Sequence, residues 1–322
     1  MHPGFSVIFL TTLIGAGQGL FLALYAADVA QALRLIELSG DRAFFAFGSL
    51  IALVFTGAGA IASLFHLGHP ERAWRAMAMW RTSWLSREGI ALPLFMLLVL
   101  LYGLAHWFAW PVARAIGAAA TVLCFALFIC TGMIYACIKF LQEWASPLTV
   151  INYTVLGSAS GFTLATAFAA LAADNLVAPY GIAAIALTLL GLATRSASLL
   201  RNGRIKRKST MQSATGIHHP RIVQKSMGFM GGSYNTREFF HGRSKGFLRS
   251  IKWVFLALAF VAPLLLLGLG VGLGVGLGKP GAASASLLCM AFVVQYAGLI
   301  AERWFFFAQS NHPQNLYYQA IS

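Results

Sequence analysis

Charged residues are scarce in this sequence. Asp, Glu, Lys and Arg together make up 10% of its 322 residues, whereas a soluble domain carries about 25%. The scarcity arises because long stretches exclude charge almost entirely, and the mean hydropathy is +0.75. A helix that crosses a bilayer needs about 20 apolar residues, and several stretches meet that length. The composition therefore excludes an ordinary soluble protein and predicts an integral membrane protein.

Patterns that bind redox metals or perform catalysis in soluble enzymes are lacking too. None of the four cysteines belongs to a CxxC pair or to a cluster spaced like iron–sulfur ligands. None of the eight histidines falls deep in an expected membrane helix, where the axial ligands of a membrane haem would lie. We therefore expect no haem and no iron–sulfur cluster in this chain. No Walker motif, catalytic triad or HExxH zinc motif is recognisable.

Eight apolar segments are long enough to cross a membrane, which predicts an all-α integral membrane fold. They run roughly over 5–30, 43–65, 88–107, 112–138, 150–173, 179–198, 252–277 and 283–303. Gly15 and Gly19 are spaced four residues apart, as are Gly268, Gly272 and Gly276. Small residues at this spacing let helix backbones approach closely, so we expect both groups to lie at helix–helix contacts. The glycine-rich run from Leu267 to Gly278 can instead be a mobile helix end of low helix propensity.

A basic segment separates the sixth and seventh apolar segments. Thirteen Lys or Arg residues lie between Arg195 and Lys252, Glu238 is the only acid among them, and the segment carries +12 of the net charge of +14. A basic loop between membrane helices is ordinarily retained in the cytoplasm and contacts anionic lipid, so we expect no nucleic acid partner. These patterns predict three regions. Residues 1–198 form helices one to six, residues 199–251 form a cytoplasmic loop that docks a partner subunit, and residues 252–322 form helices seven and eight with a cytoplasmic tail.

The basic residues are distributed unevenly between the two sides of the membrane. Besides the basic loop and the tail, the side of the N-terminus receives Arg72, Arg75, Arg81, Arg87 and Lys139. The other side receives only Arg34, Arg42, Arg114 and Lys279. Because basic loops stay in the cytoplasm, we expect a multi-pass protein of the bacterial inner membrane with both termini cytoplasmic.

Two ionisable residues mark the boundary between the second and third apolar segments. His66 follows the second segment and Glu88 opens the third, so both are expected at the same membrane depth. A quinone needs an apolar slot, hydrogen-bond partners for its carbonyl groups and side chains that exchange two protons. Histidine titrates near neutral pH, and a desolvated glutamate can relay a proton. The pair is therefore a candidate quinone site.

Structural roles for the same residues remain open alternatives. His66 can be an interfacial histidine bonded to a backbone carbonyl, and Glu88 a helix N-terminal acid that interacts with the helix dipole. Arg72 and Arg75 can serve topology and lipid headgroups instead of stabilising charge on a reduced quinone. Trp84 fits an interfacial aromatic belt.

The stretch that begins at His66 resembles the anchor subunit family of dimethyl sulfoxide reductases. The family's signature is His-Leu-Gly-x-Pro, then Arg-Ala, then Ser-x-Leu-Ser-x-Glu. The matching residues here are His66, Leu67, Gly68, Pro70, Arg72, Ala73, Ser83, Leu85, Ser86 and Glu88. The last apolar segment fits as well, with Gly298 and the run GLIAERWFFFA.

The resemblance implies eight helices in two four-helix bundles. It also implies two partners, a molybdopterin catalytic subunit and an iron–sulfur electron-transfer subunit, and associates His66 and Glu88 with quinol binding. We assign the quinone site, for ubiquinone or menaquinone, to His66, Glu88, Arg72, Arg75, Trp84 and Ser83. We expect the partner to dock on Tyr234, Arg237, Glu238, Phe239, Glu302 and Arg303.

Two features depart from the bacterial dimethyl sulfoxide reductase anchor: the cytoplasmic placement of the motif and the long basic loop. Both resemble the branch that serves cytoplasm-facing sulfite dehydrogenases. We therefore expect no catalytic centre in this chain, but a membrane anchor that passes electrons from a sulfite-oxidising partner to quinone. A quinol-oxidising anchor of an S-oxide or N-oxide reductase is one alternative. A small-molecule transporter is another, although its charges would be expected at the bilayer midplane.

Overall fold

The computed structural model describes residues 1–36, 41–223, 241–278 and 280–316. Eight of its helices are long and apolar enough to cross a membrane, and no strand occurs among these residues. The all-α expectation with eight spans is therefore confirmed. The spans are α1 (Phe5–Ala32), α2 (Asp41–Leu64), α3 (Trp84–Trp107), α4 (Ala113–Ala136), α5 (Pro147–Ala172), α6 (Val177–Gly203), α9 (Lys245–Leu256) continued by α10 (Ala262–Gly276), and α11 (Ala282–Ala308).

Short elements complete the described chain. One π-helical turn, η3 (Ala257–Val261), joins α9 to α10, so the seventh span is continuous. The other short elements are η1 (Pro70–Met77), η2 (Asp174–Leu176), α7 (Met211–Thr215) and η4 (Pro313–Leu316).

Several helices extend beyond the apolar segments that predict them. The Ser83 hydroxyl accepts a hydrogen bond from the Ser86 amide (3.4 Å), so α3 begins four residues before Glu88. The Ser244 hydroxyl caps α9 in the same way, through the Phe247 amide (3.2 Å). Side-chain caps stabilise a helix start whatever the hydropathy of the first turn, which is why hydropathy alone places these boundaries too late.

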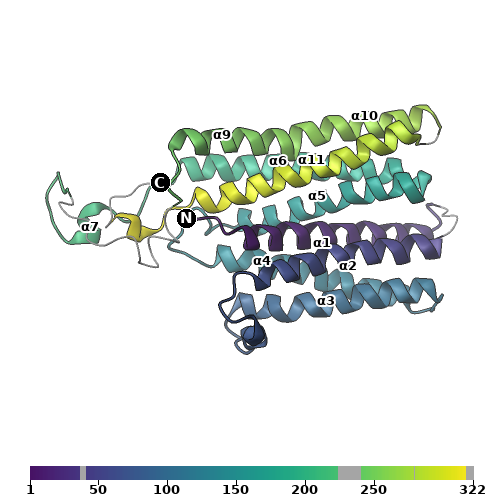
Figure 1. Ribbon diagram of the computed structural model, residues 1–322, viewed down its shortest axis with the longest axis horizontal. Helices are drawn as coiled ribbons and strands as arrows, with labels where there is room; N and C mark the ends of the chain where they lie inside the picture. The colour runs from purple at the N-terminus through teal and green to yellow at the C-terminus, as the bar shows by residue number, and fades with distance from the viewer. Residues whose placement is uncertain (37–40, 224–240, 279, 317–322) are drawn as a thin grey trace.

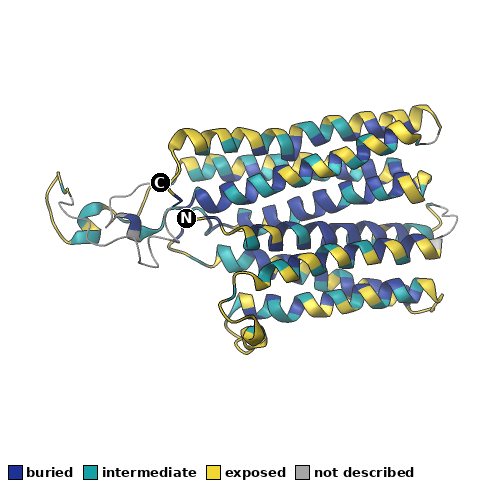
Figure 2. Ribbon diagram, viewed as in Figure 1, coloured by how far each residue is buried: buried dark blue, intermediate teal, exposed yellow. Residues whose placement is uncertain are grey.

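The eight spans form two four-helix bundles side by side (Figure 1). Helices α1 to α4 form one bundle, and α5, α6, α9 with α10, and α11 form the other. Helices α1 and α5 pack against each other and join the bundles. They are also the most enclosed spans. In their apolar 18-residue stretches, 78% and 67% of the residues are buried, against 33–44% in the other spans. Figure 2 shows the outer helices exposing residues along their lengths, as lipid-facing helices do.

Glycines set the close approach of α1 and α5. A Cβ atom at Gly15 would lie 3.2 Å from the Cα of Gly157, and one at Gly19 would lie 2.9 Å from the Cα of Gly161. The packing role predicted for Gly15 and Gly19 is therefore confirmed. The same prediction is wrong for the second group of glycines, because no atom of the described residues lies within 4 Å of a Cβ position at any of the three. This second group consists of Gly268, Gly272 and Gly276.

The N-terminus and the last turns of α11 lie at the same end of the molecule as η1 and α7 (Figure 1). The Met1 ammonium group donates a hydrogen bond to the carbonyl oxygen of Ser310 (2.8 Å), which ties the two ends of the chain together. We call this the terminal end of the molecule, and the opposite one, where α1 ends and α2 begins, the far end.

Candidate functional site

The chain between the end of α2 at Leu64 and the start of α3 at Trp84 folds over one side of the bundle, and we call this segment the cap. After α2, the chain forms the exposed 3-10 helix η1 and then returns to Ser83. Arg87 of α3 fastens this cap: its Nε donates to the Trp80 carbonyl (2.9 Å) and its Nη2 to the Arg81 carbonyl (2.8 Å). Its guanidinium also lies over the Trp84 ring, 4.3 Å from the centroid. The cap is thereby held against the bundle.

A groove of about 460 Å3 lies between this cap and the helices. Its walls come from Leu10 of α1, the last turns of α2, residues 66 and 67, η1, and the first turns of α3. His66 and Glu88 both line it, and nearly all other lining residues are apolar. The volume lies within the range of about 300–1,000 Å3 typical of small-molecule sites. An apolar slot with two ionisable groups fits a quinone ring.

His66 lies at the rim of the groove. Its side chain remains exposed in part, and desolvation by the neighbouring groups lowers its pKa below the ordinary 6.5. The imidazole is therefore neutral near pH 7, with one N–H to donate and one nitrogen to accept a hydrogen bond.

Glu88 is buried at the inner wall of the groove, with 6% of its surface exposed. Its carboxyl group accepts a hydrogen bond from the Thr131 hydroxyl of α4. Glu88 and Thr131 also line an internal cavity of about 20 Å3, distinct from the groove, which continues between the bundles. Because the internal cavity has room for about one water molecule, Glu88 connects the groove to the bundle interior.

The structure brings together two of the six residues assigned to the quinone site. Arg72 and Arg75 are exposed on η1 and do not line the groove: Arg72 contacts Glu71 (3.7 Å), and Arg75 lies over the Trp74 ring.

Ser83 and Trp84 do not line the groove either. Ser83 caps α3, and Trp84 supports the Arg87 guanidinium. Both residues therefore support the cap.

The six residues expected at the docking surface divide into two groups. Tyr234, Arg237, Glu238 and Phe239 lie outside the described residues. Glu302 and Arg303 are buried inside the molecule, with 1% and 4% of their surfaces exposed. A partner subunit can reach these two only if the bundle opens, because they pair within the chain. We therefore do not retain them as docking residues.

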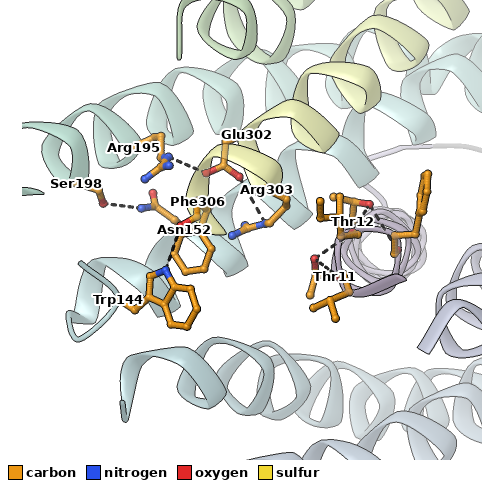
Figure 3. A network of polar contacts seen from close by, with 12 residues as sticks. Thr11, Thr12, Trp144, Asn152, Arg195, Ser198, Glu302, Arg303 and Phe306 are labelled. Atoms are coloured by element: carbon orange, nitrogen blue, oxygen red, sulfur yellow. Dashed lines mark hydrogen bonds and ion pairs between the residues drawn. The ribbon is translucent and has the colours of Figure 1, made fainter. Parts of the chain in front are cut away.

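Glu302 belongs to a buried charge network that hydropathy does not reveal (Figure 3). Arg195 Nε of α6 lies 2.7 Å from Glu302 Oε1, and Arg303 Nε lies 3.5 Å from Glu302 Oε2. The Arg303 guanidinium also lies 3.6 Å from the centroid of the Tyr153 ring of α5. The charge pattern groups Arg195 with the basic loop, but α6 continues to Gly203 and places it inside the bundle. The available signal was that an arginine within an apolar segment needs a partner.

A second buried carboxyl group lies at the far end. Asp28 of α1 is 3% exposed and has three partners on α3 and α4. Tyr102 Oη donates to Oδ2 (3.2 Å), His106 Nε2 lies 3.1 Å from Oδ2, and Arg114 Nε donates to Oδ1 (3.3 Å). The polar partners satisfy both carboxylate oxygens, so this cluster joins three helices of the first bundle.

Comparisons with known proteins agree with the motif. The family model described as DMSO reductase anchor subunit (DmsC) matches residues 1–308. The chain is also 52% identical, over 335 aligned residues, to a protein of Allochromatium vinosum that is named as a subunit of sulfite dehydrogenase. The alignment covers 100% of both chains.

Proposed function

The chain belongs to the dimethyl sulfoxide reductase anchor subunit family, and from this we propose that it is the quinone-reactive membrane subunit of a molybdenum oxidoreductase. Electrons pass between an iron–sulfur partner subunit and a quinone held in the groove of His66 and Glu88. The observation that carries the proposal is this groove, in which both residues line one apolar space at the membrane boundary.

His66 and Glu88 divide the work of binding and proton exchange. Neutral His66 donates a hydrogen bond from its imidazole N–H to one quinone carbonyl, which orients the ring. Glu88, at the buried inner wall, exchanges a proton with the second carbonyl oxygen. Apolar side chains of the groove, such as Leu64, Leu92 and Met96, hold the ring and the start of the tail. A quinone takes up two electrons and two protons when it is reduced.

The sequence favours sulfite as the source of the electrons and the cytoplasm as the site of its oxidation. The relative from Allochromatium vinosum is named as a subunit of sulfite dehydrogenase. The excess of basic residues at the terminal end supports a cytoplasmic location for that end, and with it for the cap and the partner subunits. The family description names a reductase, which supports quinol oxidation as the second candidate direction through the same groove.

Quinone reduction by the purified complex tests the proposal. Sulfite serves as donor and decyl-ubiquinone or menadione as acceptor, and ferricyanide as acceptor reports the catalytic partner alone. We expect His66→Ala and Glu88→Gln to slow quinone reduction about 100-fold, the typical size of a lost acid–base group, with ferricyanide reduction unchanged.

Two matched controls lie outside the groove. His69 is exposed and bonded to Glu71 (2.9 Å), and Asp28 is a buried carboxyl group at the far end. His69→Ala and Asp28→Asn are expected to retain the wild-type rate with quinone. Unchanged rates in the His66 and Glu88 variants would refute the site. A wild-type complex inactive with sulfite and every acceptor would favour the quinol-oxidising direction.

A further inference from the structure

We infer that protons reach Glu88 through the interior of the chain, along a polar route between the two bundles that begins at Glu143 and Arg201 and passes Glu302. This inference rests on the proposed function, since Glu88 is the acceptor at the end of the route. It assigns a proton-carrying role to Glu302 and a positioning role to Arg195 and Arg303.

The route ends at the inner wall of the quinone groove. Glu88 lines both the groove and the internal cavity of about 20 Å3. Thr11, Thr131, Tyr153 and Arg303 line the same cavity, so polar groups from α1, α4, α5 and α11 surround its space. A water molecule in a cavity of this size needs two to four polar partners, and these residues supply them.

Arg303 lies between this cavity and the next one. It lines the first cavity and also a narrower space of about 10 Å3, whose walls include Asn152, Arg195 and Glu302. Figure 3 shows Arg303 between Glu302 and the α1 threonines. The second space is at the lower size limit for one water molecule.

Polar atoms around the second space have hydrogen-bonding capacity left. Glu302 Oε2, Arg195 Nη2 and Asn152 Oδ1 are buried and have no hydrogen-bond partner among the described residues. Unsatisfied buried groups in proteins are ordinarily completed by water. Their concentration around one narrow space therefore indicates hydration there, which a packed structural ion pair would not require.

The second space opens toward the terminal end. Glu143, Arg201 and Asn202 also line it, and all three are partly exposed. Arg201 Nη2 donates to the carbonyl oxygens of Gln142 (3.0 Å) and Ala145 (3.1 Å), which fixes the α4–α5 connection beside the opening. A proton from water can thus enter at Glu143 and meet Glu302 inside the bundle.

Charge balance suits this arrangement to a mobile proton. Two guanidinium groups, Arg195 and Arg303, accompany two carboxyl groups, Glu302 and Glu88, so the set is neutral when both acids are ionised. A proton on Glu302 leaves Arg303 facing a carboxylate at Glu88 across the first cavity. A proton on Glu88 leaves Arg303 paired with Glu302. Arg303 therefore faces a carboxylate in either position, which limits the cost of moving the proton through a buried region. When Glu302 is protonated, Arg195 keeps the neutral Glu302 carboxyl group as its partner.

The test measures quinone reduction and its solvent isotope effect in the purified complex, with sulfite as donor and decyl-ubiquinone as acceptor. We expect Glu302→Gln to slow quinone reduction at least ten-fold and to raise the ratio of rates in H2O and D2O, because proton delivery becomes rate-limiting. Glu302→Asp is expected to recover much of the rate. Reduction of ferricyanide should remain at the wild-type level.

A second variant keeps the test decisive if Glu302→Gln fails to assemble. Asn152→Leu keeps every charge but fills the second space with an apolar side chain, and we expect it to slow quinone reduction about five-fold. Asp28→Asn, a buried carboxyl group outside the route, is the matched control and should keep the wild-type rate and isotope effect.

The outcomes separate the route from the proposed function. If Glu88→Gln is slow while Glu302→Gln and Asn152→Leu are as fast as wild type, the route is refuted and the quinone site stands. If Asp28→Asn is slowed as strongly as Glu302→Gln, protons enter from the far end and the route is again refuted. If Glu88→Gln is also fast, the proposed function fails together with the route.

Discussion

The two ends of the molecule each bury carboxyl groups between helices but surround them differently. At the far end, Asp28 has three polar partners within 3.3 Å, and it lines neither the quinone groove nor the two internal cavities. At the terminal end, Glu88 has one hydrogen-bond partner and lines two cavities. Glu302 is paired with two arginines, but its Oε2 accepts no hydrogen bond in the described chain.

This difference supports a structural role for Asp28 and is consistent with the proton exchange proposed for Glu88 and Glu302. A carboxylate with complete hydrogen bonding is a fixed connection, because moving its proton or its partners costs each bond. An incompletely bonded carboxylate beside a cavity can change protonation and exchange partners at lower cost. We therefore regard the Asp28 cluster as a contact that holds the helices of the first bundle together. Glu88 and Glu302 are the two carboxyl groups that we propose to exchange protons.

The largest effect on stability is expected from the arginines that accompany these carboxyl groups. Arg195→Met removes the closer of the two arginine partners of buried Glu302 and should lower the free energy of unfolding by about 3–5 kcal/mol, as for other broken buried pairs. Its counterpart at the far end, Arg114, has a side chain that is 64% exposed, so Arg114→Met should cost about 1 kcal/mol or less. Thermal unfolding of the purified complex in lipid nanodiscs measures both. Equal losses would remove the distinction between the two ends.

A smaller loss is expected from the far-end carboxyl group itself. Asp28→Ala leaves the Tyr102 hydroxyl and the His106 ring nitrogen without their acceptor, which should cost about 2–3 kcal/mol. Asp28→Asn retains an acceptor oxygen and should cost less. The rate of quinone reduction per assembled complex should stay unchanged in both. A slower rate in an assembled complex would mean that Asp28 takes part in turnover.

Sequence patterns predict the parts of this structure that depend on local properties. Hydropathy predicts eight spans, spacing predicts the close approach at Gly15 and Gly19, and the motif with its membrane depth brings His66 and Glu88 into one groove.

The contacts that the sequence leaves hidden join distant segments. Arg195 and Glu302 are 107 positions apart, and their pairing depends on how α6 and α11 are each packed against α5. Gly268, Gly272 and Gly276 have the same four-residue spacing as Gly15 and Gly19, yet a Cβ atom at any of them would meet no atom of the described chain within 4 Å. Spacing describes one helix surface but does not specify which other helix, if any, lies against it.

The cap of the proposed quinone groove offers a test with a moderate expected effect at the terminal end. Arg87→Ala removes the two hydrogen bonds that hold the Trp80 and Arg81 carbonyls, so the cap should loosen and the KM for quinone should rise about five-fold, which corresponds to about 1 kcal/mol. Arg81→Ala is the matched control, because Arg81 uses its backbone carbonyl for this contact and its side chain lies over Trp80. An unchanged KM in Arg87→Ala would show that the cap contributes nothing to binding.

The smallest effect concerns the pH dependence of quinone binding through His66. Desolvation lowers the pKa of His66 below 6.5, so the ring is neutral at pH 7 and becomes charged only as the pH falls through this lowered pKa. We expect the KM for quinone to stay constant above about pH 7 and to rise about two- to three-fold in more acidic solution, as a charged ring binds water in preference to an apolar groove. His66→Gln keeps a hydrogen-bond donor but does not titrate, so its KM should not change with pH in this range. A rise that begins above pH 7, or one that persists in His66→Gln, would assign the titration to another group. Since Asp28 lies at the far end, Asp28→Asn should leave the KM profile as in wild type, which ties the effect to the terminal end.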